Sequence, residues 1–223
     1  MATKKIIMVG DSAYAEVAYE YFTQDSPYEV AAFAVEKEFL GENFFCGLPV
    51  VDLEDVEKEY APGEYGFHVA ITYIQLNRVR ARLVAAMTAK GFEPVSYVSN
   101  TVRLWPSVKI GRHCFIFENN VIQPGVTIGD NCVLWSGNHI GHHSTVSDNC
   151  FISSQVVLSG FSRVGDYSFI GVNATLADTV EIGADCFIGA GSVINKNLPD
   201  NTVTRPPDGK KVPGAKMLMG VAE

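Results

Sequence analysis

One spacing dominates the second half of this chain: every sixth residue from position 98 to position 194 is aliphatic. The run has no break, and its members are Val98, Leu104, Ile110, Ile116, Ile122, Ile128, Leu134, Ile140, Val146, Ile152, Leu158, Val164, Ile170, Leu176, Ile182, Ile188 and Ile194. If about a third of residues were Ile, Leu or Val, chance would give this run less than roughly once in ten million trials. A repeat of six residues predicts a parallel β-helix.

A second period of eighteen residues lies inside the first. Similar segments recur at this spacing: GRHC (111–114), GDNC (129–132), SDNC (147–150), GDYS (165–168) and GADC (183–186). Eighteen residues are three hexads, so each coil is expected to have three short faces and three corners. The last residues of these segments then stack at one inward corner, and we interpret the four cysteines among them as small core residues.

The chain before residue 96 has a different pattern, in which strand-like and helix-like stretches alternate. Strands are expected over 5–10, 28–35, 47–51, 67–71 and 94–98, and helices over 13–22, 52–60 and 77–90. This alternation predicts a small parallel α/β sheet. We therefore expect a Rossmann-like α/β domain over residues 1–96, a β-helix over 97–198 and a C-terminal tail over 199–223.

Charge and composition exclude several classes of function. The net charge of −8 argues against a nucleic-acid-binding surface. No apolar stretch has the length of a membrane span, and the N-terminus does not resemble a signal peptide, so a cytoplasmic protein without membrane insertion is expected. The five cysteines form no CxxC pair, which predicts neither a disulfide framework nor a zinc finger.

The segment NHIGHHSTV (138–146) holds three of the five histidines of the chain. The first and fifth residues of each hexad are expected to point inward, so His142 and His143, the third and fourth, face outward near a corner. His139 is the last residue of the preceding hexad. Gly160 lies one coil beyond His142, where it would expose a backbone N–H beside the imidazole. This pair suits a general base with an oxyanion donor, but two exposed turn histidines remain an alternative.

Clustered histidines can also form a metal site. Some parallel β-helix enzymes hold zinc with three histidines between subunits. Zinc requires imidazoles that converge at tetrahedral angles. Adjacent His142 and His143 do not easily share one ion, and His113 and His139 lie on other coils or corners. His68 lies on an expected strand and is interpreted as structural. We expect no metal.

The combination of a small Rossmann-like domain with an unbroken hexapeptide region resembles the sugar O-acyltransferase family. The segments HIGHHSTVSDNCFISSQVVLSG (139–160) and IGAGSVI (188–194) carry the resemblance. The family includes sialic-acid O-acetyltransferase-like proteins and N-acetyltransferases that act on nucleotide-linked 4-amino-sugars. The resemblance implies a left-handed β-helix, a homotrimer and active sites between neighbouring subunits.

The resemblance also assigns roles to individual residues. His142 occupies the position of the general base that takes a proton from the sugar, and Gly160 the position whose N–H binds the acetyl oxygen. Val172 and Ala190 match positions that line the acetyl-CoA groove. Phe151 matches another such position, which is often a histidine in the amino-sugar enzymes.

His143 departs from the family pattern and is included among the catalytic residues. Several relatives have a carboxylate there, which makes the catalytic histidine more basic. A neutral imidazole lacks that negative charge. We therefore expect a weaker base, or one that an acidic residue elsewhere orients.

The loop after the first strand also departs from the family, because it reads GDSAYAE (10–16) and has one glycine where relatives are glycine-rich. A single glycine is a weak signal for a phosphate-binding loop. The candidate contacts to a sugar nucleotide are Gly10, Ser12, Ala13, Tyr14, Glu36 and Thr72.

Taken together, these residues predict an acetyl-CoA-dependent acetyltransferase that modifies a sugar, nucleotide-linked and destined for a surface polysaccharide. N-acetylation of an amino-sugar is slightly preferred over O-acetylation, because an amine that binds in its neutral form needs only a weak base. A zinc-dependent β-helix hydratase and a non-catalytic trimeric scaffold are the alternatives.

Overall fold

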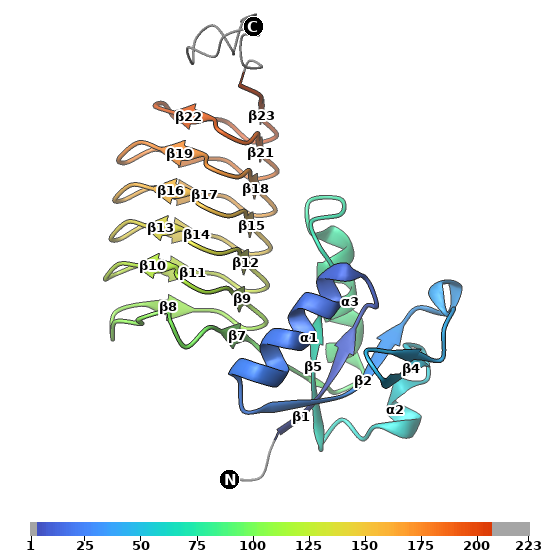
Figure 1. Ribbon diagram of the computed structural model, residues 1–223. Helices are drawn as coiled ribbons and strands as arrows, with labels where there is room; N and C mark the ends of the chain where they lie inside the picture. Colours follow the sequence, from blue (N-terminus) through green and yellow to red (C-terminus); the bar gives the residue numbers. More distant parts are fainter. Residues whose placement is uncertain (1–3, 207–223) are drawn as a thin grey trace, which may run out of the picture.

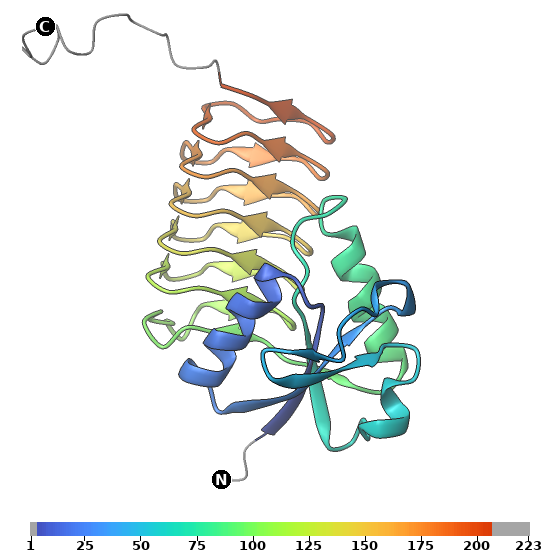
Figure 2. The same cartoon turned by 45° about the vertical axis from the view of Figure 1, so that its right-hand side comes forward.

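The structure is a computed structural model that describes residues 4–206. It has two units: an α/β unit near the N-terminus, and a β-helix whose lower coils pack against that unit (Figures 1 and 2). Helix α1 (Ala13–Asp25) lies between the two units and contributes buried side chains to their interface. Among the described residues, no helix is both long and apolar enough to cross a membrane. Of the expected tail, residues 207–223 lie outside the described part.

The α/β unit is built on one sheet with the strand order β3-β4-β2-β1-β5-β6. Its strands are β1 (Lys4–Val9), β2 (Tyr28–Val35), β3 (Phe44–Phe45), β4 (Leu48–Asp52), β5 (Tyr65–Val69) and β6 (Glu93–Pro94). Besides α1, it contains the 3-10 helix η1 (Lys37–Phe39), α2 (Val56–Glu59) and α3 (Arg78–Ala89). All pairings are parallel except β3–β4, so the expected parallel sheet carries one antiparallel edge.

Three local expectations in this unit were wrong. The helix expected over 52–60 is a single turn, because the side chain of Asp52 accepts the N–H of Glu54 and so forms a turn that competes with a helix. The β3–β4 hairpin was missed; its turn uses positive φ at Cys46 and Gly47, as a tight hairpin requires. The strand expected over 94–98 is split between β6 and the first strand of the β-helix.

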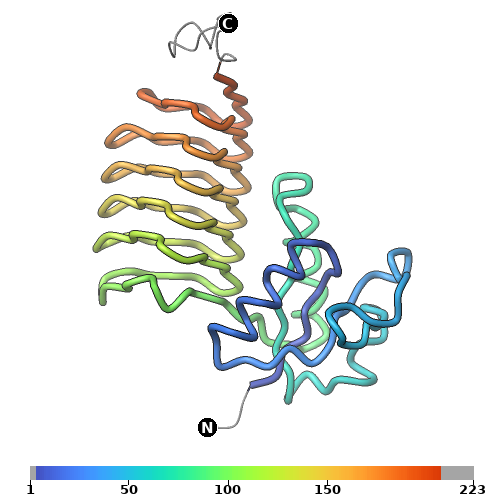
Figure 3. Tube along the Cα trace, viewed as in Figure 1, coloured from blue at the N-terminus to red at the C-terminus, as the bar shows by residue number. Residues whose placement is uncertain are grey.

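The β-helix has three parallel sheets, and its coils stack as three-cornered turns (Figure 3). We name the sheets by their outward residues. The aromatic face consists of β7 (Tyr97–Val98), β9 (Phe115–Ile116), β12 (Val133–Leu134), β15 (Phe151–Ile152), β18 (Phe169–Ile170), β21 (Phe187–Ile188) and β23 (Val203–Thr204). The valine face consists of β10 (Val121–Ile122), β13 (His139–Ile140), β16 (Val157–Leu158), β19 (Thr175–Leu176) and β22 (Val193–Ile194). The charged face consists of β8 (Lys109–Ile110), β11 (Thr127–Ile128), β14 (Thr145–Val146), β17 (Arg163–Val164) and β20 (Glu181–Ile182).

Each corner from residue 113 to residue 191 contains one residue with a left-handed backbone, always the fourth of its hexad. These residues are His113, Asn119, Gly125, Asn131, Gly137, His143, Asn149, Gln155, Phe161, Tyr167, Asn173, Thr179, Asp185 and Gly191. Asn, Asp and Gly tolerate positive φ best, which explains their frequency at these corners. His143 and Phe161 adopt it in spite of bulky side chains, with φ of 58° and 57°.

The interior of the β-helix confirms the interpretation of the cysteines. The thiols of Cys114, Cys132 and Cys150 donate to carbonyl oxygens fifteen residues ahead, at 3.0–3.1 Å. The hydroxyl of Ser168 donates to the carbonyl oxygen of Gly183 at 3.0 Å, so this serine makes the same hydrogen bond as the cysteines. Leu104 contradicts the hexad expectation, because it is 47% exposed. Leu104 follows β7, the first strand of the first coil. No coil precedes this one in the stack, so none covers Leu104.

The interface between the two units contains a buried polar cluster around His113. Its Nε2 accepts the N–H of Val69 at 2.8 Å, so the proton lies on Nδ1, which donates to Oδ1 of Asn131 at 2.8 Å. The ring of His68 stacks on it with centroids 4.5 Å apart. Arg80 is fully buried and donates to the carbonyl oxygens of Val69 and His113. His113 was expected on an exposed corner; the α/β unit covers that corner.

The two buried histidines predict a loss of stability in acid. Burial, and to a lesser extent the charge of Arg80, holds the pKa of both His68 and His113 well below the usual 6.5. The unfolded chain takes up these protons below pH 6.5 and the folded chain does not, so stability falls by about 1.4 kcal/mol per pH unit for each histidine. We expect the free energy of unfolding in urea to be about 3 kcal/mol lower at pH 5.5 than at pH 7.5.

The variant His68→Phe separates this effect from general acid sensitivity. Removing buried His68 should reduce the slope of stability against pH by about half. An unchanged slope in this variant would contradict the assignment.

Candidate active site

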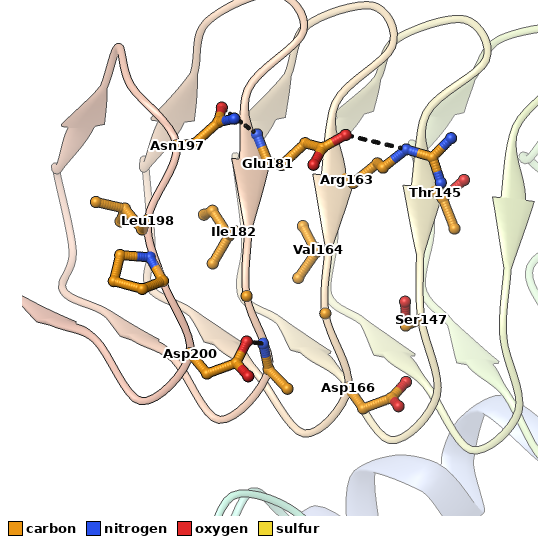
Figure 4. A pocket seen from close by; sticks show the side chains of 14 residues that line it. Thr145, Ser147, Arg163, Val164, Asp166, Glu181, Ile182, Asn197, Leu198 and Asp200 are labelled. Carbon is orange, nitrogen blue, oxygen red and sulfur yellow. Dashed lines mark hydrogen bonds and ion pairs between the residues drawn. The ribbon is translucent and has the colours of Figure 1, made fainter.

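The three faces of the β-helix differ in chemistry. Phenylalanines dominate the aromatic face, and α1 covers its lower part. On the charged face, Arg163 pairs with Glu181 at 3.4 Å, and the Oδ1 of Asn197 accepts the N–H of Glu181 (Figure 4). The shallow depression over this face, about 640 Å³, is lined by none of the residues predicted for the site.

A cleft of about 510 Å³ lies where the upper aromatic face meets the loop after β5. It is lined by Thr72, Tyr73, Trp135, Phe151, Ser153, Ser154, Phe169, Gly171, Val172, Phe187 and Ala190. The structure thus brings together Phe151, Val172 and Ala190, which were predicted to line the acetyl-CoA groove. Thr72 from the α/β unit lies in the same cleft. Tyr73, which sequence reasoning missed, forms one wall: its ring lies 5.0 Å from Phe151 and 4.7 Å from Phe169, between centroids.

The predicted acceptor residues lie at the carboxyl ends of β1, β2 and β5. Strand order changes direction at β1, and ligands of open α/β sheets bind beside such a point. At Gly10, where φ is +113°, an added Cβ would lie 3.0 Å from the carbonyl oxygen of Ala70, so the backbones of the two strand ends lie close together. Ser12 and Ala13 are exposed at this edge.

Two of the predicted acceptor contacts already have protein partners. Both carboxylate oxygens of Glu36 accept from the guanidinium of Arg82, at 2.6 and 2.8 Å. The ring of Tyr14 is buried against Phe115 and Trp135 in the interface between the units. The segment from Ala13 is helical and turns the Tyr14 side chain inward, where it packs between the two units.

The cleft wall is held to the β-helix by side chains at the start of α3. The side-chain amide of Asn77 donates to the carbonyl oxygen of Asn149 at 2.8 Å. Arg78 pairs with Asp185, and its guanidinium lies 4.4 Å from the ring centroid of Tyr167. These contacts fix the loop that carries Tyr73 against the coils.

His142 and Gly160 meet at the corner between the valine and charged faces, as the eighteen-residue period predicts. A Cβ added to Gly160 would lie 2.7 Å from Cε1 and 2.8 Å from Nε2 of His142. The imidazole therefore occupies the space that a side chain would fill. Within residues 4–206, the N–H of Gly160 donates to no protein acceptor, which leaves a free backbone donor beside the ring.

His143 lies next to this pair in a defined position. Its Nδ1 is 3.2 Å from Nδ1 of His142, a distance at which one nitrogen donates and the other accepts. Its ring stacks on Phe161, with centroids 5.1 Å apart and planes 13° apart. A Cβ at Gly125 would lie 2.8 Å from the same ring, so only glycine leaves room below it.

An acidic residue that sequence reasoning missed also lies at this corner. Oδ1 of Asp178 is 3.1 Å from the position of an added Gly160 Cβ. Asp178 follows Gly160 by one coil, so the same period could have found it.

The histidine corner and the aromatic cleft are separate in one chain. The cleft lies at the corner between the aromatic and valine faces, where Val172 and Ala190 are found, and the width of the valine face separates it from His142. One chain alone therefore does not bring the predicted base to the predicted groove.

Comparison with known proteins agrees with this architecture. The family described as bacterial transferase hexapeptide (six repeats) matches residues 107–142 and 161–196. No curated protein matches the chain. A solved mutant of perosamine N-acetyltransferase from Caulobacter crescentus, in complex with CoA and GDP-perosamine, is 26% identical with a TM-score of 0.81, covering 91% of this chain and 93% of that one.

Two further solved structures share the fold. The acetyltransferase domain of PglB from Neisseria gonorrhoeae is 24% identical with a TM-score of 0.80, covering 90% of this chain and 95% of that one. WeeI from Acinetobacter baumannii is 20% identical with a TM-score of 0.76, covering 89% and 95%.

These matches confirm the expected fold class, a Rossmann-like α/β domain followed by a left-handed parallel β-helix of hexapeptide repeats. The chain contains the hexapeptide repeats of bacterial transferases, and the solved structures that share its fold are acetyltransferases. Within that class its resemblance is to the sugar acetyltransferases, as the segments 139–160 and 188–194 had indicated.

Proposed function

We propose that this chain transfers an acetyl group from acetyl-CoA to a nucleotide-linked sugar, and that the acceptor group is an amine rather than a hydroxyl. The observation that carries the proposal is the free N–H of Gly160 beside the imidazole of His142. A base and an oxyanion donor side by side are what direct acyl transfer requires. The complex of perosamine N-acetyltransferase with CoA and GDP-perosamine supports the class of both substrates.

In this mechanism His142 acts through Nε2. It takes the proton that the acceptor nitrogen releases on attacking the thioester carbon, and it returns that proton to the departing sulfur. The N–H of Gly160 donates to the carbonyl oxygen as negative charge develops there. Asp178 adds a negative charge at the same corner.

His143 sets the tautomer of the base. For Nε2 of His142 to accept a proton, its Nδ1 must carry one, and Nδ1 of His143 lies at the right distance to accept it. His143 therefore orients the base without adding negative charge.

The substitution His143→Gly tests this positioning role. Glycine tolerates the left-handed backbone of position 143, so folding should be unaffected, while the acceptor for Nδ1 of His142 is lost. We expect kcat to fall by about tenfold with unchanged KM for acetyl-CoA. A loss as large as that of His142→Ala would mean that the two rings act as one unit.

A homotrimer completes the site in this proposal. The valine face lies between the histidine corner and the cleft corner, and it has no charged residue among its outward positions. Val121, Val157 and Val193 are exposed on it, at 54%, 36% and 65%. If three valine faces pack around one axis, the His142 corner of each chain meets the Val172 corner of the next.

Location in the cytoplasm and a role in surface polysaccharide synthesis belong to the same proposal. All five cysteines are free thiols, which is typical of proteins in a reducing compartment. The direct test is release of free CoA thiol from acetyl-CoA with a panel of nucleotide-linked amino-sugars and their hydroxyl counterparts. Turnover with an amino-sugar and none with the hydroxyl sugar supports the proposal; no turnover with any nucleotide sugar contradicts it.

A further inference from the structure

His139 is the one titratable side chain on the outward positions of the valine face. The outward column of this face is Val121, His139, Val157, Thr175 and Val193. The residues two positions further along each strand are Gln123, Gly141, Ser159, Ala177 and Asn195. A partly exposed imidazole thus lies between two valines on a small, uncharged surface, and the acyl-transfer mechanism does not use it.

The proposed homotrimer brings three copies of this residue together. Three valine faces arranged symmetrically around the axis would all face its centre, so the outward column of each chain would lie next to the axis. Three symmetry-related His139 side chains then stand at one height around the axis, and an imidazole is long enough to reach it. Valine neighbours above and below would shield the rings from bulk water.

We propose that the trimer binds one divalent transition-metal ion, such as Zn²⁺, on its threefold axis through the three His139 imidazoles. The inference rests on the trimer of the proposed function. Three neutral imidazoles from different chains can converge at the angles that the adjacent His142 and His143 of one chain cannot provide. The fourth ligand position is open to water or an anion. The ion holds the subunits together and takes no part in acyl transfer.

The neighbours of His139 on its own face are uncharged. The strands packed on either side, β10 (Val121–Ile122) and β16 (Val157–Leu158), carry no titratable group. Without an ion, three imidazoles in an apolar interface would leave polar nitrogens without partners, which is costly. Binding an ion satisfies one nitrogen of each ring.

Native mass spectrometry of the full-length protein, purified with and without added Zn²⁺, tests the inference. We expect the wild-type trimer to carry one zinc ion per three chains. The substitution His139→Val continues the valine column, so the trimer should persist while zinc affinity falls at least 100-fold. Thr175→Val changes the same column without removing a ligand, and should keep one ion per trimer.

The possible outcomes separate the inference from the proposed function. A trimer without zinc, or zinc bound equally by wild type and His139→Val, overturns the metal site. One ion per chain in both proteins points to the His142–His143 pair instead, and also overturns it. A monomer under all conditions contradicts the proposed assembly, whatever the result with zinc.

Discussion

Replacing His142 with alanine is expected to lower kcat by about 10²–10⁴, the range found when a general base is removed. The side chain is exposed and stacks edge-on against Phe161, so its loss should cost little stability. Because the ring touches the reacting atoms only during transfer, KM for acetyl-CoA should change little. Steady-state kinetics with a free-thiol readout measures both quantities.

Lys196→Ala is the matched control for this variant. Lys196 occupies the same corner position three coils further along and is equally exposed. Its replacement should leave kcat unchanged. Near-normal turnover of His142→Ala would rule out the assigned base and, with it, the mechanism.

The substitution Gly160→Ala is expected to lower kcat by about 10²-fold. The new methyl group would lie within 2.8 Å of two atoms of the His142 ring, closer than real carbon contacts allow. The ring is exposed and can turn away, so the protein should fold normally, but the base then leaves its position beside the N–H. A shift of the base by about 1 Å can cost this much in rate.

A double-mutant cycle decides whether Gly160 acts through His142. In a His142→Ala background the methyl group has no ring to displace, so Gly160→Ala should cause little further loss. Fully additive losses would show that the glycine acts separately from the histidine. Gly63→Ala is the control, because an added Cβ there meets no atom within 4 Å.

Much of the candidate site could be predicted from the period of the sequence. The eighteen-residue spacing placed Gly160 beside His142, and the same arithmetic would have found Asp178. The outward column of each face could also have been read from the sequence, at steps of eighteen residues. What periodicity could not supply was Tyr73, because the loop after β5 reaches the aromatic face only when the α/β unit packs there.

The errors have the same origin. Leu104 fits the hexad pattern but has no coil beneath it, so it stays exposed. The burial of two further residues has the same cause: His113 occupies a corner position that is exposed in an isolated β-helix, and Tyr14, a predicted acceptor contact, lies at the start of α1. Both are buried because the two units meet at these residues.

The sequence by itself determined the β-helix, its inward cysteines and the corner that carries His142. Each coil repeats the same local conformation, so the role of a residue follows from its position within eighteen. Only the tertiary structure decided that the aromatic cleft and the histidine corner lie at different edges of one prism, with the valine face between them. That separation depends on where the α/β unit packs, and such a contact between distant segments leaves no period in the chain.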